Sequence, residues 1–364
     1  MTQSRRRRVY AHAFTWRDIL PPCMPLGSKV DSPLQDGDLV SCLTGFNLRA
    51  RRHALVTLKI HHQTIYRYNQ SVNLGPHRLM LRPRESLDLR LISIDVTAAP
   101  DAAVTWTQDV FGNAVAIANF GAAAEGLCID SFVEIELNAA AWPVFEIAAT
   151  AIFFPFLYSD DEWADLGALT IQQYPDPSGR LRDWARAFVR GDRTDTLSLL
   201  KDLSAGVSAW INYQSRDEEG TQSPTETLDR GWGSCRDFAV LFVEAARSLG
   251  FGARIVSGYR YNPEGSSGEG STHAWAEVYV PGAGWITFDP TNRGVGGLNL
   301  IPVAVARNIR QAMPIAGSFI GSADSFLGMS VQVLVTSEAA PRMGNRPEKQ
   351  REFACMGAQS APNE

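Results

Sequence analysis

The sequence is short of cysteine, of long apolar runs and of positive charge. Its 364 residues include five cysteines, which are scattered, odd in number and without any C-x-x-C pair. That spacing argues against a disulfide framework and gives no support to a zinc site. A membrane-spanning helix would need about 18 consecutive apolar residues, and no such run occurs. The net charge is −5, so the composition does not indicate nucleic acid as a partner.

The first 52 residues show no sustained periodicity, and we predict that they form a partly disordered extension. Arg5 to Arg8 would suit the start of an export signal, but Asp18 and Pro21 interrupt the stretch where its apolar part would follow. We interpret the arginines as a solvated tail, with a contact to nucleic acid or membrane as the alternative. The protein is accordingly expected to be cytoplasmic.

Residues 53–149 carry short runs of β-type residues that turn signals separate. Apolar and polar residues alternate there, as in a strand with one buried face. Several short strands at this spacing predict a compact antiparallel β domain. The runs are 55–63, 65–68, 79–83, 89–96, 103–108, 114–119 and 131–138.

Residues 150–336 combine helical patterns with further strands, which predicts an α+β core. Apolar residues at helical spacing indicate four helices, and β-type runs indicate four strands. The polar residues 337–364 are predicted to form a tail. The predicted helices are 160–168, 180–189, 196–213 and 235–249, and the predicted strands are 253–261, 273–280, 285–289 and 331–336.

Cys235 stands at the predicted start of an amphipathic helix. Gly231 and Gly233 lie in a tight loop before it, and Gly250 supplies the stop signal after it. The first turn of a helix presents unpaired N–H groups and the positive end of the helix dipole, and both favour a thiolate. We therefore expect Cys235 to be a nucleophile. Cys128 lies inside an apolar run, and we interpret it as a buried core thiol.

His273 and Asp289 lie at the ends of two strands that have the pattern of a hairpin. Apolar residues occupy the even positions of both strands, and a slip by one residue would expose one of the two apolar faces. A three-residue loop over 281–283 pairs Val280 with Gly284 and places Asp289 diagonal to His273 on one face, about 7–8 Å away. A four-residue loop would put them on opposite faces unless a bulge intervened. The apolar pattern therefore supports a base at His273 that a carboxylate at Asp289 orients.

Three motifs resemble those of the transglutaminase-like superfamily. They are Gly231-Trp232-Gly233-Ser234-Cys235-Arg236-Asp237, Thr272-His273-Ala274-Trp275 and Gly284-Trp285-Ile286-Thr287-Phe288-Asp289-Pro290. The upstream segment 60–84 is similar to the N-terminal β domain of bacterial members. The resemblance covers roughly 54–336 and implies a papain-like core, in which the helix carrying Cys235 packs on an antiparallel sheet that supplies His273 and Asp289.

The resemblance implies acyl transfer through a thioester on Cys235, with His273 as the base and Asp289 as its orienting carboxylate. Relatives often have an aromatic donor upstream of the nucleophile; Tyr213 stands there as either an oxyanion donor or a packing residue. Animal relatives include calcium-dependent members, but the sequence has no acidic loop of the calcium type, so we expect neither a metal nor a cofactor. Further candidates for the substrate cleft, with structural packing or pairing as the alternative, are Trp232, Trp275, Glu277 and Trp285.

Three functions are compatible with these residues. Hydrolysis of a peptide or carboxamide bond and transfer of the acyl group to an amine share one acyl-enzyme, and a binding module would keep the fold without the reaction. Bacterial relatives are often inferred to be peptidases or amidases, so we favour a cysteine protease or amidase that acts on a protein or peptide. A protein-glutamine gamma-glutamyltransferase is the alternative enzyme. The oligomeric state and the preferred peptide do not follow from the sequence.

Overall fold

A computed structural model describes residues 55–141, 143–215, 220–263 and 271–338, all of which belong to one compact unit. The predicted N-terminal extension and residues 339–364 of the predicted tail lie outside the described residues. Antiparallel sheets at the start of the described chain are followed by a core with helices, which is the α+β arrangement that the sequence predicts. None of the described helices is long and apolar enough to cross a membrane.

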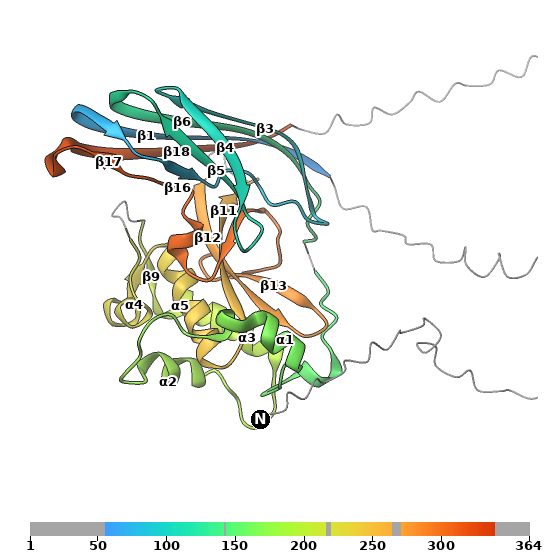
Figure 1. Cartoon of the computed structure of the whole chain (residues 1–364). Helices are drawn as coiled ribbons and strands as arrows, with labels where there is room; N and C mark the ends of the chain where they lie inside the picture. Colours follow the sequence, from blue (N-terminus) through green and yellow to red (C-terminus); the bar gives the residue numbers. More distant parts are fainter. Residues whose placement is uncertain (1–54, 142, 216–219, 264–270, 339–364) are drawn as a thin grey trace, which may run out of the picture. The chain divides into compact units, whose positions relative to one another are not determined.

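Two antiparallel sheets make up the N-terminal region (Figure 1). The first has the order β17-β1-β6-β3, with β18 also paired to β1, and the second has the order β16-β2-β5-β4. The strands of the first sheet are β1 (Val56–Leu74), β3 (Leu89–Ala99), β6 (Ala123–Leu137), β17 (Phe319–Ile320) and β18 (Phe326–Glu338). The strands of the second sheet are β2 (His77–Leu79), β4 (Ala102–Gln108), β5 (Ala114–Phe120) and β16 (Ile315–Ala316).

Alternation along β1 decides which side of the first sheet is buried. Even-numbered residues such as Leu58 and Ile60 are buried, whereas Lys59 between them is exposed. This is the period of two that a strand with one covered face requires. Farther along β1, apolar side chains from the two sheets meet in a shared cluster that includes Tyr68, Val72, Leu79, Ala116, Leu127 and Ile129. The two sheets therefore pack face to face.

The position of β18 differs from the domain boundary that the sequence predicts. The prediction assigns the strand at 331–336 to the core, but β18 pairs with β1 in an antiparallel register that runs from Thr57↔Glu338 to Tyr68↔Phe326. Val333 and Val335 continue the buried face of β1. Alternation along a strand would suit either sheet, so only the pairing of segments far apart in the sequence decides where the strand lies. The N-terminal sheet is thus completed by a strand from the far end of the described chain.

A five-stranded antiparallel sheet with helices on one face forms the core (Figure 1). Its order is β14-β13-β12-β11-β15, from β11 (Ala253–Arg260), β12 (Ser271–Val280), β13 (Gly284–Asp289), β14 (Gly294–Val295) and β15 (Leu300–Ala306). The helices are α1 (Asp160–Leu166), α2 (Arg180–Arg186), α3 (Thr196–Trp210), α4 (Pro224–Arg230) and α5 (Cys235–Ser248). Short elements connect them: η1 (Ala149–Ala151), β7 (Phe153–Phe154), η2 (Gly167–Thr170), β8 (Thr194–Asp195), β9 (Asn212–Tyr213), β10 (Trp232–Gly233), η3 (Ile309–Ala312) and η4 (Ala323–Ser325).

The sequence analysis does not predict α4 or β15. A signal for α4 was available, because Ser223 and Glu226 form a capping box around Pro224. The run of β15 is apolar on both faces, and such a run cannot be told from a buried helix by periodicity alone. β15 is buried almost throughout because the core and the N-terminal sheets cover its two sides.

Helix α5 lies at the centre of the core cluster. Phe238 and Phe242 are buried, and the ring of Phe242 lies 5.3 Å from that of Phe288 on β13. Ala276 and Ile286 present the even face of the hairpin to the same cluster. The helix that begins with Cys235 therefore packs on the sheet that carries the histidine and the aspartate.

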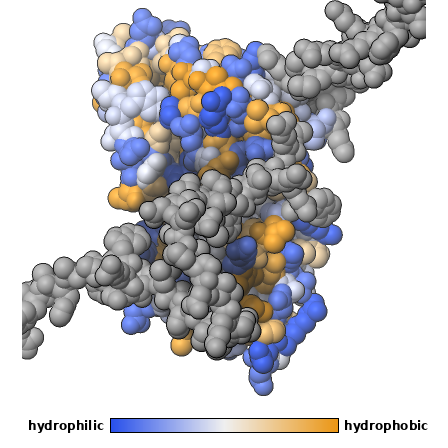
Figure 2. Space-filling model, turned by 90° about the vertical axis from the view of Figure 1, so that its right-hand side faces the viewer, coloured by the Kyte–Doolittle hydropathy of each residue, from blue (hydrophilic) through white to orange (hydrophobic). Residues whose placement is uncertain are grey.

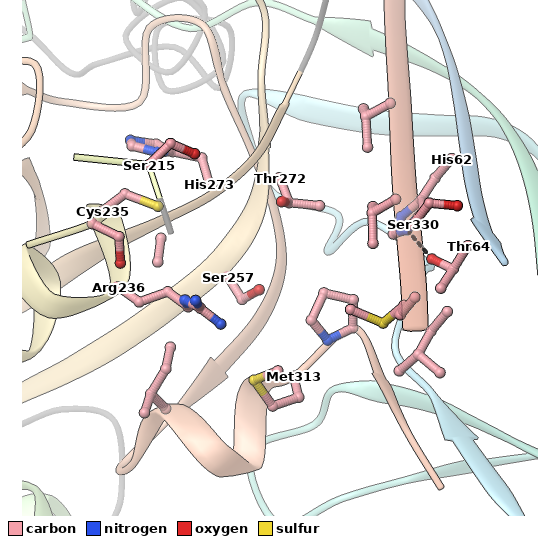
Figure 3. A pocket seen from close by; sticks show the side chains of 18 of the residues that line it. His62, Thr64, Ser215, Cys235, Arg236, Ser257, Thr272, His273, Met313 and Ser330 are labelled. Atoms are coloured by element: carbon pink, nitrogen blue, oxygen red, sulfur yellow. Dashed lines mark hydrogen bonds between the residues drawn. The ribbon is translucent and has the colours of Figure 1, made fainter. Parts of the chain in front are cut away.

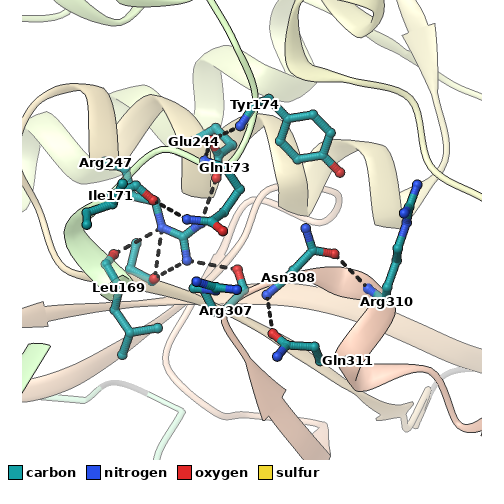
Figure 4. Close-up of polar contacts among 11 residues, drawn as sticks. Leu169, Ile171, Gln173, Tyr174, Glu244, Arg247, Arg307, Asn308, Arg310 and Gln311 are labelled. Atoms are coloured by element: carbon teal, nitrogen blue, oxygen red, sulfur yellow. Dashed lines mark hydrogen bonds and ion pairs between the residues drawn. The ribbon is translucent and has the colours of Figure 1, made fainter. Parts of the chain in front are cut away.

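A buried ion pair ties the far end of α5 to its surroundings (Figure 4). Arg247 Nη1 lies 2.6 Å from Glu244 Oε1, with side-chain exposures of 1% and 2%. Glu244 Oε2 accepts hydrogen bonds from the N–H groups of Gln173 and Tyr174. The remaining guanidinium donors bond to the carbonyl oxygens of Leu169, Ala253 and Arg307. Both charges are thus compensated, as buried ions require, and α5 is fixed to β11 and to the segments around it.

Asn113 connects the N-terminal sheets to the core. Its fully buried side chain donates to the carbonyl oxygen of Val305 at 2.7 Å and accepts from the N–H of Val305 at 2.9 Å. The N–H of Arg84 donates to the carbonyl oxygen of Pro302 at 2.8 Å. These bonds satisfy polar groups of β15 that would otherwise be buried without a partner, and they fix the first half of the described chain against the core sheet.

Exposed apolar side chains occur on the N-terminal sheets. They include Ile92, Trp106 and Phe132, and the ring of Phe132 stacks on His61 at 4.2 Å between centroids. Figure 2 shows one face of the molecule, on which apolar and polar residues are interspersed. Scattered exposure of this kind is ordinary for a folded protein.

Candidate active site

Asp237 fixes the start of the helix that carries Cys235. It is fully buried, and its Oδ2 accepts hydrogen bonds from the N–H and the hydroxyl of Ser234, both at 2.8 Å. Its Oδ1 accepts the N–H of Gln222 at 2.7 Å. A carboxylate in the first turn also complements the helix dipole. Cys235 is therefore held at the first position of α5, as the sequence predicts.

The hairpin of β12 and β13 has the register that the hydrophobic pattern predicts. Val280 pairs with Gly284, which confirms a three-residue loop. The even-numbered apolar residues of both strands belong to the same buried cluster as α5; they are Ala274, Ala276, Val278, Val280, Ile286 and Phe288. His273 and Asp289 consequently come together at the end of the hairpin beside the helix start.

A hydrogen bond joins His273 to Asp289. Nε2 of the ring lies 2.9 Å from Oδ2 of the carboxylate, and the two residues are 7% and 2% exposed. Asp289 Oδ2 also accepts the side-chain amide of Asn292 at 2.8 Å, and Oδ1 accepts the N–H of Thr291 at 3.1 Å. The sequence analysis assigns no role to Asn292, although an Asp followed by polar turn residues commonly bonds to the backbone just after it. The carboxylate is thus held from several directions.

The charges of this set favour an ionised thiol beside a protonated imidazole. Burial raises the pKa of Cys235, but the hydrogen bond and positive charge of His273, the N–H of Ala274 and the charge of Arg236 together lower it below the usual value. Burial lowers the pKa of His273, whereas its hydrogen bonds with Asp289 and Cys235 and their negative charges raise it to about 9. The two shifts describe one coupled pair, in which the proton lies on the ring rather than on the sulfur.

The pKa of Asp289 is lowered in the same set. Burial would raise it, but the hydrogen bond and charge of His273 and the two donors of Asn292 outweigh burial. The carboxylate therefore stays ionised and can stabilise the imidazolium. Because Nε2 is bonded to Asp289, Nδ1 is the ring nitrogen that remains for the thiol.

A second Cys–His–Asp cluster lies on the outer side of the N-terminal sheet. Cys128 Sγ donates to Asp130 Oδ2 at 3.2 Å, and His61 Nε2 lies 2.8 Å from Asp130 Oδ1. The thiol is half-buried beside polar residues, so its interpretation as a core thiol is wrong. Burial, the hydrogen bond to Asp130 and its charge raise the pKa of Cys128 to about 11. Here the carboxylate contacts the thiol as well as the imidazole, so the cluster disfavours a thiolate.

Cys235 and His273 open onto a cleft of about 620 Å³. Arg236, Tyr213 and Thr272 lie on the same side of the cleft, while His62 and residues of β18 line the opposite side. Figure 3 shows Cys235, Arg236 and His273 on one side, Thr64 and Ser330 on the other, and Met313 between them. The cleft is therefore bounded by the core and by the first N-terminal sheet.

The structure places four sequence candidates away from this cleft. Trp275 is 1% exposed and packs with β15, and its ring stacks on His273 at 5.9 Å between centroids. Glu277 pairs with Arg254 at 2.7 Å, and Trp285 lies against the same guanidinium at 3.9 Å. Trp232 lies beside the Arg230 guanidinium at 5.4 Å. On the face of β12 that the sequence assigns to the cleft, Glu277 instead pairs with a neighbouring strand, and Trp275 is covered by the N-terminal region. The alternation pattern does not show what covers a face, so it could not reveal this.

Tyr213 does line the cleft. It is 54% exposed, its ring packs edge-on against Phe238 at 6.1 Å between centroids, and β9 pairs with β10 just before Cys235. Burial and the nearby charge of Cys235 raise the pKa of Tyr213, so it remains a neutral hydroxyl donor. Both sequence interpretations of Tyr213, the cleft donor and the packing residue, are therefore compatible with its position.

The described residues contain no group of three or more His, Cys, Asp or Glu side chains arranged to hold a metal ion. At the cleft, Cys235, His273 and Asp289 stand together with neighbouring hydrogen-bond donors. Such a set suits nucleophilic attack on an acyl carbon.

Comparison with known proteins relates both parts of the described chain to transglutaminase-like proteins. Residues 182–290 match the model of the transglutaminase-like superfamily, and residues 58–136 match that of the bacterial transglutaminase-like N-terminal region. The first match contains Cys235, His273 and Asp289. The second covers the chain from β1 to β6.

Three similar proteins illustrate these matches. A Mycobacterium tuberculosis protein described as uncharacterized is 27% identical over 296 residues, which are 76% of this chain and 92% of that protein. A protein-glutamine gamma-glutamyltransferase of Pseudomonas aeruginosa is 29% identical over 92 residues, which are 24% of this chain and 13% of that protein. A solved structure from Cytophaga hutchinsonii, provisionally described as a cysteine protease, has a TM-score of 0.62 at 18% identity over 79% of this chain and 92% of that chain. This last likeness shows a shared fold.

Proposed function

We propose that this protein, whose core belongs to the transglutaminase-like superfamily, hydrolyses peptide or carboxamide bonds through Cys235. The observation that carries the proposal is the hydrogen-bonded order of Asp289, His273 and Cys235, with the pKa of the thiol lowered and that of the imidazole raised. A thiolate at neutral pH is the reactive form of cysteine. A cysteine that only packs in the core does not need an ionised thiol at a cleft, so the ionisation of Cys235 favours a chemical role.

In the proposed reaction the thiolate of Cys235 attacks the carbonyl carbon and forms a tetrahedral oxyanion. The C–N bond then breaks, and the leaving amine takes the proton from Nδ1 of the His273 imidazolium. A thioester remains on Cys235. His273, now neutral, accepts a proton from water, and the hydroxide attacks the thioester. The carboxylic acid departs, and the thiolate of Cys235 and the imidazolium of His273 are restored. Asp289 keeps the ring oriented and stabilises its charged form in each half-reaction.

The oxyanion needs donors near Cys235. The N–H of Cys235 lies in the first turn of α5, where backbone donors have no partner within the helix. We assign it as the first oxyanion donor, with the hydroxyl of Tyr213 as the second. Removal of one such donor typically lowers the rate by about 10²–10³-fold.

The openness of the cleft to solvent favours hydrolysis over amine transfer. Tyr213 and Met329 line it and are 54% and 51% exposed, so water can reach a thioester on Cys235. The fold shared with the Cytophaga hutchinsonii protein supports the same preference. The local similarity to a protein-glutamine gamma-glutamyltransferase supports amine transfer as the second candidate.

A test compares the wild type with Cys235→Ala, using dimethylated casein as the acyl donor and dansylcadaverine as the amine. We expect new peptide termini or released ammonia, absence of dansyl incorporation, and loss of all turnover in Cys235→Ala. Cys128→Ala is the matched control and should keep full activity. Dansyl incorporation without hydrolysis would identify the transferase instead. A Cys235 that forms no acyl adduct and reacts with iodoacetamide like an ordinary thiol would support a binding module.

A further inference from the structure

The wall of the cleft that faces Cys235 comes from the first N-terminal sheet. In the antiparallel register, His62 pairs with Val333 and Thr64 with Val331, so these side chains share one face of the sheet. All four residues line the same cleft as Cys235. Figure 3 shows β18 opposite the side of the cleft that carries Cys235 and His273, with His62, Thr64 and Ser330 labelled there.

This wall leaves apolar side chains open to the cleft. Val333 is 9% exposed, but along the same strand Val331 is 44% and Met329 is 51% exposed. Met313, Pro314 and Ile315 continue the apolar lining between the two walls. Strands normally cover their apolar face, so the uncovered stretch of β18 beside a nucleophile indicates a surface that a bound molecule covers.

Two polar side chains of the wall, those of His62 and Thr64, already have hydrogen-bond partners. His62 Nδ1 lies 2.9 Å from the hydroxyl of Tyr259, and its Nε2 lies 3.0 Å from that of Thr64. Burial lowers the pKa of His62 to about 4, so the ring is neutral at pH 7. Among the described residues that line the cleft there is no Asp or Glu, and Arg236 lies on the opposite wall. A polar side chain placed against Met329 and Val331 would lose water over an apolar surface, whereas an apolar side chain is favoured there.

We propose that this wall, formed by Met329 and Val331 of β18 with Met313, binds an apolar side chain of an extended peptide whose carbonyl group Cys235 attacks. The N-terminal sheet is then a substrate-selecting surface and not only a packing partner of the core. The inference rests on the proposed thiol chemistry, because it names the substrate class for the same cleft. Peptides with an apolar residue at one fixed distance from the reacting carbonyl are the expected substrates.

The test uses reagents that label Cys235 without requiring turnover. A series of acetyl-tripeptide chloromethyl ketones carries leucine or asparagine, which are similar in shape, at each position in turn. Rates of Cys235 labelling are measured by peptide mass spectrometry in the full chain, with iodoacetamide as a reagent that has no peptide. At one position we expect leucine to label about tenfold faster than asparagine.

Two serine variants on one strand separate the wall from the rest of the sheet. Val331→Ser faces the cleft, whereas Leu334→Ser, at a residue 38% exposed, lies on the opposite face and pairs with His61. We expect Val331→Ser to reduce the leucine preference to about twofold or less, Leu334→Ser to keep it, and neither to change the iodoacetamide rate. Two results would overturn the inference: equal labelling by the leucine and asparagine reagents at every position, or a leucine preference that survives both Val331→Ser and Met329→Ser. If iodoacetamide still labelled Cys235 fast, the proposed thiol chemistry would stand. Slow iodoacetamide labelling of the wild type would overturn the proposed function and this inference with it.

Discussion

His273 bonds to Asp289 through Nε2, at 2.9 Å from Oδ2, and the ring therefore keeps Nδ1 for Cys235. The aspartate comes from the end of β13, the histidine from the start of β12 and the cysteine from the first position of α5. Their order in space depends on one hairpin register and one helix start. Substitutions of these three residues should consequently affect reactivity more than they affect folding.

Asp289→Asn should impair the site while keeping its shape. The amide cannot stabilise the imidazolium, and it can present its N–H₂ group to Nε2, which favours the wrong ring tautomer. The same change in a Ser-His-Asp triad lowers turnover by about 10⁴-fold. Steady-state kinetics on the substrate found with dimethylated casein would measure the loss. Thermal unfolding of the same samples would show whether the fold is retained.

Asn292→Ala should lower turnover less than Asp289→Asn does. It removes one donor to Asp289 Oδ2 at 2.8 Å but leaves the carboxylate and His273 in place. We expect a loss of about 10–100-fold, because one hydrogen bond to a charged group contributes about 1.5–3 kcal/mol. A loss as large as that of Asp289→Asn would mean that Asn292 itself contacts the reacting atoms.

Alkylation should distinguish Cys235 from Cys128 across pH. The pKa of Cys235 is lowered by its partners, whereas that of Cys128 is raised to about 11. At pH 7 a thiol of that kind is ionised in only about one molecule in ten thousand. Iodoacetamide at pH 6–7 should therefore label Cys235 first, as peptide mapping would show.

The decrease of turnover at high pH should follow the deprotonation of His273. Its pKa is raised to about 9, so the imidazolium that protonates the leaving amine is present below that pH and is lost above it. Turnover should fall above about pH 9, while alkylation of Cys235 should not, because the thiolate persists there. Parallel loss of both rates above pH 9 would contradict the assignment of the proton donor.

Arg247→Met should destabilise the protein strongly. It leaves Glu244 charged at 2% exposure and removes the donors to the carbonyl oxygens of Ala253 and Arg307. Breaking a buried ion pair on one side costs about 3–5 kcal/mol. Urea unfolding would measure the change in free energy.

Arg190→Met is the matched control for that prediction. Arg190 and Asp202 are 2.7 Å apart, nearly the spacing of the buried pair, but their side chains are 77% and 40% exposed. Such pairs contribute about 0–1 kcal/mol. Equal losses in the free energy of unfolding for Arg247→Met and Arg190→Met would show that burial does not determine how much the Glu244–Arg247 pair stabilises the fold.

Asp237→Ala should loosen the start of α5. The variant leaves the N–H groups of Ser234 and Gln222 without the carboxylate that they bond to. We expect a loss of about 2–6 kcal/mol in the free energy of unfolding, from two buried donors at about 1–3 kcal/mol each. Ser223→Ala removes the N-cap side chain of α4, which accepts the N–H of Glu226 at a less buried site, and should cost about 1 kcal/mol. Comparable losses for the two variants would argue against a special role for Asp237.

Local patterns were sufficient for much of the fold and for the candidate site. Alternation fixed the register of β12 and β13, because any slip would have exposed an apolar face, and the confirmed pair Val280↔Gly284 brings His273 to Asp289. Helical spacing after Cys235 placed it at a helix start. Each of these inferences uses residues close together in the sequence, where strand and helix periods act directly.

Long-range packing decided the rest. β18 pairs with β1 across more than half of the chain, and only this pairing brings Met329 and Val331 to the cleft. The sequence places Trp275 on the cleft face of its strand, but in the structure the N-terminal region covers this residue. The sequence by itself determined which residues form the candidate site, because periodicity is a local property. The tertiary structure alone decided what faces Cys235 across the cleft, because contacts between distant segments depend on how whole sheets pack.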